Sequence, residues 1–265
     1  MISIKKDSDI EKMRRAGCIA ADILDVVCAA VKVGVSTLAL EQLTVAELDR
    51  HGATGPCYDY PGTSCPFPAH ICVSINEEIV HGIPRKDRFI GEGDLVSLDL
   101  VVCRDGFMAD STRTVAIGEI SAGKKKLLRI TERALHAGIE KAIAGNRVGD
   151  ISYAIEKCAR KGKLGIVREL VGHGIGRDMH EAPSIPNWGE RGEGERLVPG
   201  MTIAIEPMFM LGAEDIRVAD DGWTISTADG ECAAHFEHTV LITKKSPEIL
   251  TTNKMSFLLR ARDNA

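Results

Sequence analysis

Two histidines, His173 and His180, lie seven positions apart in the stretch "VGHGIGRDMHE" at residues 171–181. An imidazole can bind a metal ion, move a proton or sit as an ordinary core residue, and the stretch alone leaves these roles open. Glycines at positions 172, 174 and 176 let the backbone pass close to a metal or a substrate. The chemistry of the segment therefore has to be inferred from the other polar residues of the chain.

Acidic residues also stand inside segments of strand character. Asp99 lies in "LVSLDLVV", where strand propensity and desolvation both disfavour a carboxylate. The Asp105-Gly106 pair that follows predicts a two-residue hairpin loop, which makes Val101 face Asp110. Asp99 then faces Thr112, and the two aspartates become diagonal neighbours on one face, with β-carbons about 7–8 Å apart or less.

Two unpaired carboxylates at this short distance repel each other, and each raises the pKa of the other unless a cation lies between them. A dinuclear metal centre has this geometry, with ions about 3.5–4 Å apart that share bridging carboxylates. Any one of the acids is better explained as a salt-bridged or strand-end residue, but their joint pattern favours the metal. The predicted metal ligands are Asp99, Asp110, His173, Glu206 and Glu237.

Internal repeats support a pairing of these acids. "VGVSTLALE" at 33–41 aligns without gaps on "VGDISYAIE" at 148–156, and "GDLVSLD" at 93–99 matches "GMTIAIE" at 200–206. Apolar spacing predicts helices over 10–33, after Ser36, over 125–143 and after Gly149, with strands between and after them. We expect one domain over 1–265, with two α+β halves at about 1–118 and 119–248 related by a pseudo-twofold axis, and a tail at 249–265.

Composition limits the partners. Forty-four per cent of the residues are apolar, which is enough for a sizeable core, and the net charge of −5 argues against nucleic acid and anionic membrane as partners. No apolar run approaches the roughly 18 residues of a membrane span, so we expect a cytoplasmic protein. The eight cysteines show no C-x-x-C pair and are expected to be reduced. The "GKKKLLR" run at 123–129 is interpreted as the solvated start of a helix.

Together the motifs resemble a known family. "HGIP" at 81–84, "DLVSLD" with "ADSTRT", "GHGIGRDMHE", "AIEP" and "FEHTV" follow the order found in type I methionine aminopeptidases, which remove initiator methionine cotranslationally. The resemblance runs from the first helix to about Lys245. It implies the α+β pita-bread fold, in which two pseudo-symmetric halves form a curved antiparallel sheet covered by helices.

The resemblance also implies a metal arrangement. Asp99 would bind one divalent ion, His173 and Glu206 the other, and Asp110 and Glu237 would bridge them. Glu206 is the favoured general base. Carboxylate-rich sites accept several divalent ions, so Co, Mn, Fe, Zn and Ni all fit. A monovalent cation, Na or K, is expected near Asn76 through backbone carbonyls.

Substrate contacts are implied in the same way. His180 would bind the carbonyl oxygen and the developing oxyanion, and His81 the scissile nitrogen. The methionine pocket would be lined by Tyr60, Cys72, Met179 and Trp223, a set suited to a thioether. An aromatic is frequent in the family where Met179 stands, and the segment from Tyr60 to Cys72 is several residues longer than the family's short loop.

Three alternative protein classes fit the sequence less well. A prolidase or Xaa-Pro aminopeptidase shares the five ligands but usually carries an additional N-terminal domain, whereas this chain begins almost directly with the first helix. A type II enzyme would need a helical insertion, for which the interval from His180 to Glu206 has no room. A non-catalytic pita-bread module that binds peptides would be expected to have lost ligands. We therefore expect a monomer that acts on N-terminal peptides of nascent chains at the ribosome and favours a small second residue.

Two further motif interpretations fail. "GHGIG" lacks the spacing of a dinucleotide-binding loop, and "HEAPS" at His180 lacks the second histidine of a zincin.

Overall fold

The computed structural model describes residues 2–62 and 65–252. Its helices are α1 (Asp7–Ala30), α2 (Thr37–His51), α3 (Ala122–Ile139) and α4 (Val148–Gly162). The four predicted helices are confirmed, with ends that differ by a few residues. Ser36 caps α2 as expected, because its hydroxyl accepts from the backbone N–H of Ala39. Ser121 does the same for α3, which moves the start of that helix ahead of the predicted position.

Short strands make up the rest of the regular structure, in four antiparallel sheets. Their orders are β1-β3-β4, β10-β11-β2, β12-β9-β5 and β14-β13-β8-β6-β7. The strands are β1 (Cys72–Ile75), β2 (Glu78–Val80), β3 (Leu95–Arg104), β4 (Phe107–Ala116), β5 (Gly165–Ile166), β6 (Gly172–Gly174), β7 (Glu181–Ile185), β8 (Thr202–Ile205), β9 (Met208–Met210), β10 (Ile216–Val218), β11 (Ile225–Thr227), β12 (Ala233–His235), β13 (His238–Leu241) and β14 (Glu248–Ile249).

The β3–β4 hairpin has the predicted register. Val101 pairs with Asp110 and Asp99 pairs with Thr112, so the two aspartates are diagonal neighbours on one face. Asp105 and Gly106 form the loop with φ of 54° and 74°, the left-handed geometry that a two-residue hairpin turn requires. The turn therefore fixes which face both carboxylates occupy.

The strand predicted over 201–209 is interrupted at Glu206 and Pro207, whereas the strand predicted over 236–243 is present as β13 and begins two residues later, after Glu237. β8 ends at Ile205 and β9 begins at Met208, while β12 ends at His235 and β13 begins at His238. The two breaks lie opposite each other, because Ile205 pairs with His238 and Met208 pairs with His235. Pro207 has no N–H to donate to a ladder, which favours a break at this point. Both glutamates thus leave the strand geometry at the same place.

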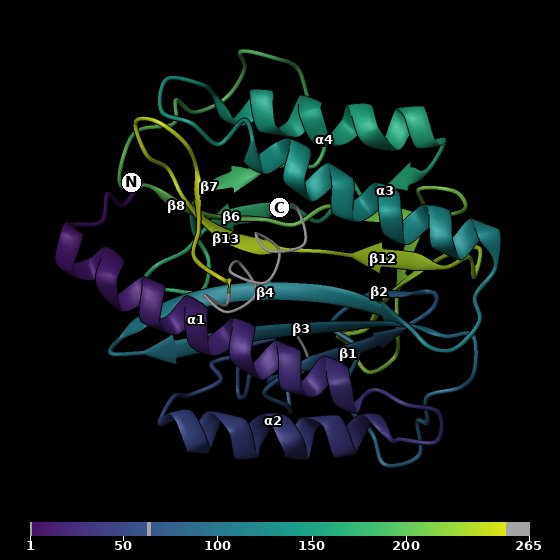
Figure 1. Cartoon of the computed structure of the whole chain (residues 1–265). Coiled ribbons are helices and arrows are strands. Elements are labelled where there is room, and N and C mark those ends of the chain that lie inside the picture. Colours follow the sequence, from purple (N-terminus) through teal and green to yellow (C-terminus); the bar gives the residue numbers. More distant parts are fainter. Residues whose placement is uncertain (1, 63–64, 253–265) are drawn as a thin grey trace, which may run out of the picture.

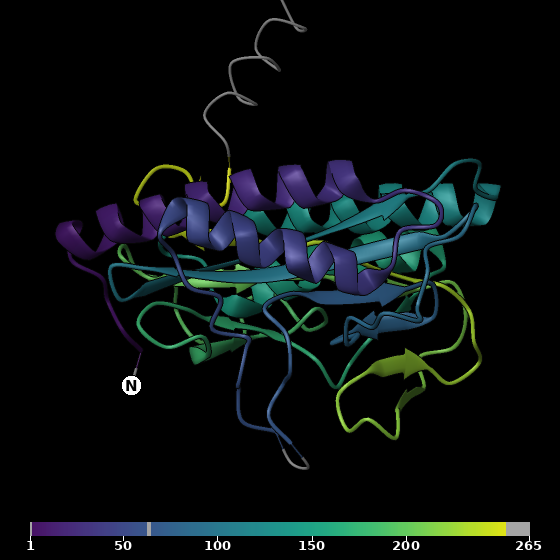
Figure 2. The same cartoon turned by 90° about the horizontal axis from the view of Figure 1, so that it is seen from below.

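The helices cover one side of the sheets. In Figure 1, α1 lies over β3 and β4, α2 packs beside α1 at the edge of these strands, and α3 and α4 lie over the later strands. Figure 2 shows all four helices on one side and the segment before β1 and the β10–β11 hairpin on the other. Two separate apolar cores lie beneath the helix pairs, one with Leu24, Leu98 and Leu100 and one with Leu127 and Ile155. A division of the chain near residue 118 stays a prediction.

All eight cysteines are free thiols, as predicted. Within residues 2–62 and 65–252, helices long and apolar enough to cross a membrane are absent. Most of the predicted tail at 249–265 lies outside the described residues.

Candidate metal centre and substrate pocket

One pocket gathers every residue that the sequence singled out as a ligand, catalyst or pocket wall. Its lining comes from strands of both parts of the chain, from the segment before β1 and from the β10–β11 hairpin, and the last two lie on the side of the sheets away from the helices (Figure 2). The predicted residues that line it are Tyr60, Cys72, His81, Asp99, Asp110, His173, Met179, His180, Glu206, Trp223 and Glu237. Residues as far apart as 60 and 237 therefore form a single site.

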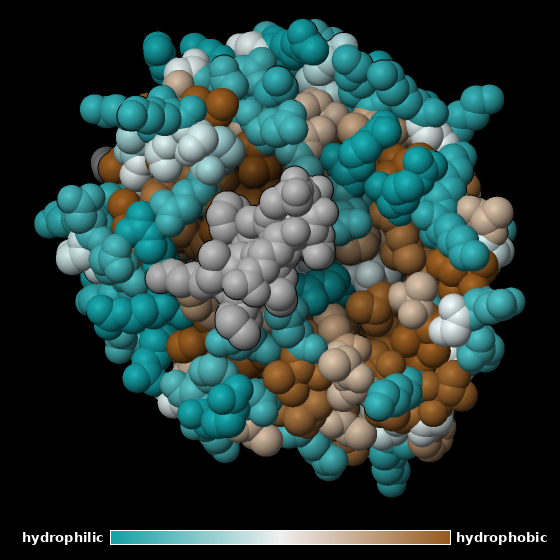
Figure 3. Space-filling model, viewed as in Figure 1, coloured by the Kyte–Doolittle hydropathy of each residue, from teal (hydrophilic) through white to brown (hydrophobic). Residues whose placement is uncertain are grey.

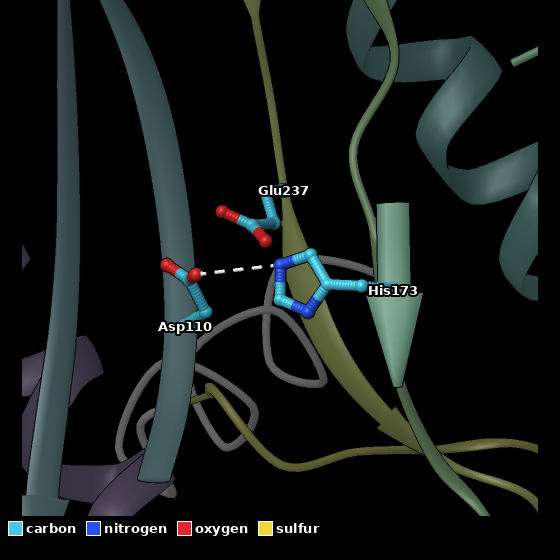
Figure 4. Close-up of side chains that lie close together, drawn as sticks. All are labelled: Asp110, His173 and Glu237. Carbon is cyan, nitrogen blue, oxygen red and sulfur yellow. Dashed lines mark ion pairs between the residues drawn. The ribbon is translucent and has the colours of Figure 1, made fainter. Parts of the chain in front are cut away.

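Possible metal-ligand atoms of the predicted residues lie close together in the pocket. One side-chain ligand atom each from Asp110, His173 and Glu237 falls within 4.8 Å of the others (Figure 4). Nε2 of His173 is 3.9 Å from Oδ2 of Asp110 and 3.5 Å from Oε1 of Glu206. Asp99 lines the same pocket and completes the predicted set of five.

Threonine hydroxyls join β4 to the segment around Glu237. Thr112 donates to Oε2 of Glu237 at 2.8 Å. The Thr239 hydroxyl accepts from the backbone N–H of Asp110 and donates to its carbonyl oxygen, each at 2.9 Å. These bonds fix the Glu237 carboxylate and the backbone that carries Asp110 relative to each other.

The buried acids lack the partners that would stabilise their charge. Burial, reinforced by the neighbouring carboxylates, raises the pKa of Asp110 and Glu237 well above its usual value, and the same holds for Glu206. Oδ1 of Asp110 and Oε1 of Glu237 are buried without a hydrogen-bond partner among the described residues. Buried carboxylates of this kind are normally paired or bound to metal, so the residues present fit divalent cations.

The histidine in this group is oriented as a metal ligand would be. Nδ1 of His173 lies 2.9 Å from the carbonyl oxygen of Gly174, which accepts from it when the proton is on Nδ1. Burial lowers the pKa of His173 to about 4, so the ring is neutral at pH 7 and Nε2 keeps its lone pair. A β-carbon on Gly172 would lie 2.4 Å from the carbonyl oxygen of Ala204, so only glycine lets β6 approach β8 this closely.

Two further histidines, His81 and His180, line the same pocket but are not among the predicted metal ligands. The hydroxyl of Tyr60 lies 2.7 Å from Nδ1 of His180, whose ring is 4.4 Å from that of His173 between centroids. Partial burial lowers the pKa of His180, and deeper burial lowers that of His81 to about 4. The His81 ring packs edge-on against Trp223. Neutral imidazoles thus flank the carboxylates next to an aromatic wall.

Comparison with known proteins identifies this combination of fold and site. The model for metallopeptidase family M24 matches residues 11–244, nearly the whole chain. The chain belongs to metallopeptidase family M24. A methionine aminopeptidase from Clostridium acetobutylicum is 45% identical over 251 residues, which cover 95% of this chain and 99% of that protein. The predicted resemblance is confirmed.

Solved structures agree with this membership. The crystal structure of a methionine aminopeptidase from Thermotoga maritima has a TM-score of 0.91 and 39% identity, and covers 96% of this chain and 100% of that one. A prolidase from Pyrococcus furiosus has a TM-score of 0.75 at 23% identity, and the match covers 95% of this chain and 66% of that one. The second likeness shows the fold alone, and with the first it confirms the pita-bread architecture for this M24 chain.

One residue that lines the pocket of this M24 chain was not among the predicted site residues. His235 is fully enclosed in the pocket wall, and its Nε2 lies 3.6 Å from Oε2 of Glu206. Burial lowers its pKa to about 4. A signal was present, because His235 precedes Glu237 by two residues in "HFEH", the spacing that places side chains on one face of an extended chain.

In the Asn76 region of the M24 chain, the positive charge comes from a lysine side chain. The ammonium of Lys124 donates to Oδ1 of Asn76 at 3.0 Å and to the carbonyl oxygen of Gly93 at 2.7 Å. The backbone carbonyl of Asn76 accepts from the N–H of Ala233 at 2.8 Å. A monovalent ion near Asn76 stays a prediction.

Metal loading of this M24 site is expected to release protons at pH 7. The raised pKa values of Asp110, Glu206 and Glu237 keep protons on the metal-free pocket, whereas a divalent ion binds the ionised forms. Apparent affinity should therefore rise as the pH is raised. Calorimetric titration in two buffers of different ionisation enthalpy measures the release, and equal heats in both buffers would contradict it.

Proposed function

We propose that this M24 metallopeptidase removes the N-terminal methionine from peptides and nascent proteins. The observation that carries the proposal is the joining, in one pocket, of an acid and histidine cluster with a wall of sulfur and aromatic side chains. The naming of the C. acetobutylicum relative as a methionine aminopeptidase supports the same substrate. A preference for a small second residue is proposed from the resemblance to type I methionine aminopeptidases.

Five residues would hold two divalent ions. Asp99 would bind one ion, His173 and Glu206 the other, and Asp110 and Glu237 both. Bound divalent ions supply Lewis acidity toward the scissile carbonyl. Which of Co, Mn, Fe, Zn or Ni serves in the cell follows availability as much as affinity.

The remaining polar groups act on the peptide. When the hydroxyl of Tyr60 donates to Nδ1 of His180, 2.7 Å away, the imidazole keeps its proton on Nε2, from which it binds the carbonyl oxygen and the developing oxyanion. His81, neutral at pH 7, accepts or donates at the scissile nitrogen. Glu206 takes a proton from the attacking water and delivers it to the leaving amine, a task that suits a carboxyl of raised pKa.

The pocket walls select the side chain. Tyr60, Cys72, Met179 and Trp223 surround the space next to the acids, and Cys57 and Phe67 extend the lining. Polarisable sulfur and aromatic edges make favourable contacts with a thioether. Burial raises the pKa of Cys57 and Cys72 well above the usual value, so both stay neutral thiols beside the substrate.

Cellular context follows from the substrate. We propose that the chain acts as a monomer in the cytoplasm on N-termini of nascent chains near the ribosome. A monovalent cation, Na or K, near Asn76 is proposed to steady the turn that leads into β2.

Substrate choice tests the proposal. Protein stripped with chelator and reloaded with Mn, Fe, Co or Zn should release methionine from Met-Ala-Ser and leave Arg-Pro-Pro intact, as measured by quantifying the free amino acid. Equal or reversed activity would instead support an Xaa-Pro aminopeptidase. Metal binding without activity on either peptide would support a non-catalytic binding module.

A further inference from the structure

Charge is distributed unevenly along the chain. Residues 122–163, from the start of α3 to the C-cap of α4, contain eleven Lys and Arg but four Asp and Glu. This part carries a charge of +7 and the rest of the chain −12, within a total of −5. The acidic total, which argued against polyanionic partners, therefore conceals a basic region.

The fold concentrates this charge at one end of the helix pair. α3 and α4 run antiparallel, because Gly162 packs against the side chain of Ile130, while Gly138 packs against Ile155. The first half of α3 thus lies beside the last half of α4 (Figure 1). Their exposed cations form what we call the basic face: Lys125, Arg129, Arg133, Arg160, Lys161 and Lys163.

The stability of the helices does not explain the basic face. Within the described residues, Arg160 is its only member in an ion pair, with the buried Glu156. Lys125, Arg129 and Arg133 recur every four residues, a spacing at which like charges destabilise a helix. Lys125 also lies near the N-terminus of α3, where the helix dipole disfavours a cation and the first turn has no acid.

The surface next to these cations is polar and hollowed. Tyr153 lines two hollows. One of them is also lined by Arg160 and Lys161 with Glu156, and the other by Lys141 and Arg191 with Asp150. The Arg191 guanidinium lies 4.4 Å from the centroid of the Tyr153 ring. Hydrophilic side chains dominate the upper part of Figure 3, where α3 and α4 lie. The hollows extend the positive surface beyond the row on α3.

We propose that the basic face binds the phosphate backbone of structured RNA. Repeated cations on a rigid helix match repeated phosphates, whose neutralisation releases counterions. An anionic membrane fits less well, because the large apolar side chains exposed in the described part of the chain all lie outside α3 and α4. RNA is chosen over DNA on the strength of the proposed function, since nascent chains emerge from an RNA-rich particle.

The geometry is compatible with simultaneous catalysis. The basic face belongs to the helix layer, whereas the segment before β1 and the β10–β11 hairpin, which border the pocket, lie on the opposite side of the sheets (Figure 2). RNA bound at α3 and α4 would leave the pocket open to a peptide.

Charge reversal on the full chain tests the proposal. The variant K125E/R129E/R133E is compared with K32E/K86E/K244E, which changes the same net charge at exposed lysines outside the basic face. Binding to a labelled RNA duplex is followed by fluorescence anisotropy between about 50 and 200 mM salt. The first variant should bind at least about tenfold more weakly and lose about three units of the log–log salt slope, whereas the control should change less than about twofold.

Other outcomes would overturn the inference. Equal losses in both variants would show an effect of net charge alone, and an absence of RNA binding by the parent protein would refute the RNA site directly. Tighter binding to a DNA duplex of the same sequence, or to phosphatidylserine vesicles, would assign the face to another partner. Release of methionine from Met-Ala-Ser is measured on the same samples, so failure of the proposed function is recorded separately.

Discussion

Replacing Asp110 by asparagine is expected to abolish high-affinity metal binding and to lower peptidase activity by at least about a thousandfold. The change keeps the shape of the side chain but removes the charge at the point where Asp110, His173 and Glu237 converge. A neutral amide is a weaker ligand for a divalent ion and cannot offset its charge. Because Asp110 is predicted to contact both ions, its loss should affect the entire centre.

The same variant should be at least as stable as the parent protein when both are free of metal. In the metal-free pocket, Asp110 must either hold a proton or place its charge in a buried site beside Glu237, Asp99 and Glu206, and asparagine, which is always neutral, avoids both costs. The temperature of unfolding should therefore not fall, whereas its rise on metal addition should disappear. This combination separates loss of a ligand from loss of the fold.

Metal content by elemental analysis and thermal unfolding with and without metal check the expectation. Asp49→Asn is the matched control, because it makes the same chemical change at an exposed position on α2. Retention of two ions by Asp110→Asn would show that Asp110 is not a ligand. A lower unfolding temperature in the metal-free state would show that its carboxylate stabilises the fold.

Much of the site could be predicted because it depends on local rules. The Asp105-Gly106 turn determines the β3–β4 register, and the register determines that Asp99 and Asp110 share a face. In the hairpin, the pattern and its structural consequence lie within a few residues. The glycines around His173 were predicted to let the backbone pass close to a metal or a substrate, and the close approach of β6 to β8 at Gly172 and Ala204 was not predicted.

The rest depended on contacts between distant segments. Alternation through "MTIAIEPMF" and "FEHTVLIT" predicts continuous strands. In the structure, both segments leave strand geometry at Glu206 and Glu237, next to the pair formed by Ile205 and His238. His235 becomes part of the pocket only because its break faces that of Glu206. The net charge of −5 argued against a nucleic-acid partner in the sequence analysis. That total is the sum of a basic region, 122–163, and an acidic remainder, so it does not describe the surface of either one.

Replacing His180 by alanine is expected to lower turnover by about a hundredfold to a thousandfold while metal content stays unchanged. Loss of a single donor to a developing oxyanion has an effect of this size. The His180 ring lies beside the ring of His173, 4.4 Å away between centroids, so proximity alone would suit either a ligand or a donor. Its Nδ1 faces the Tyr60 hydroxyl at 2.7 Å, which favours the donor because the other nitrogen then carries the proton.

The partner residue gives the matched variant. Tyr60→Phe keeps the ring that lines the pocket but removes the hydroxyl that selects the His180 tautomer. It should lower kcat about tenfold, an effect typical of residues that orient a functional group, with little change in KM for Met-Ala-Ser. In His180→Ala, removal of the same hydroxyl should have no further effect, since there is no imidazole left to orient. Additive losses in the double variant, or a loss of metal in either single variant, would show that Tyr60 and His180 do not act as one donor unit.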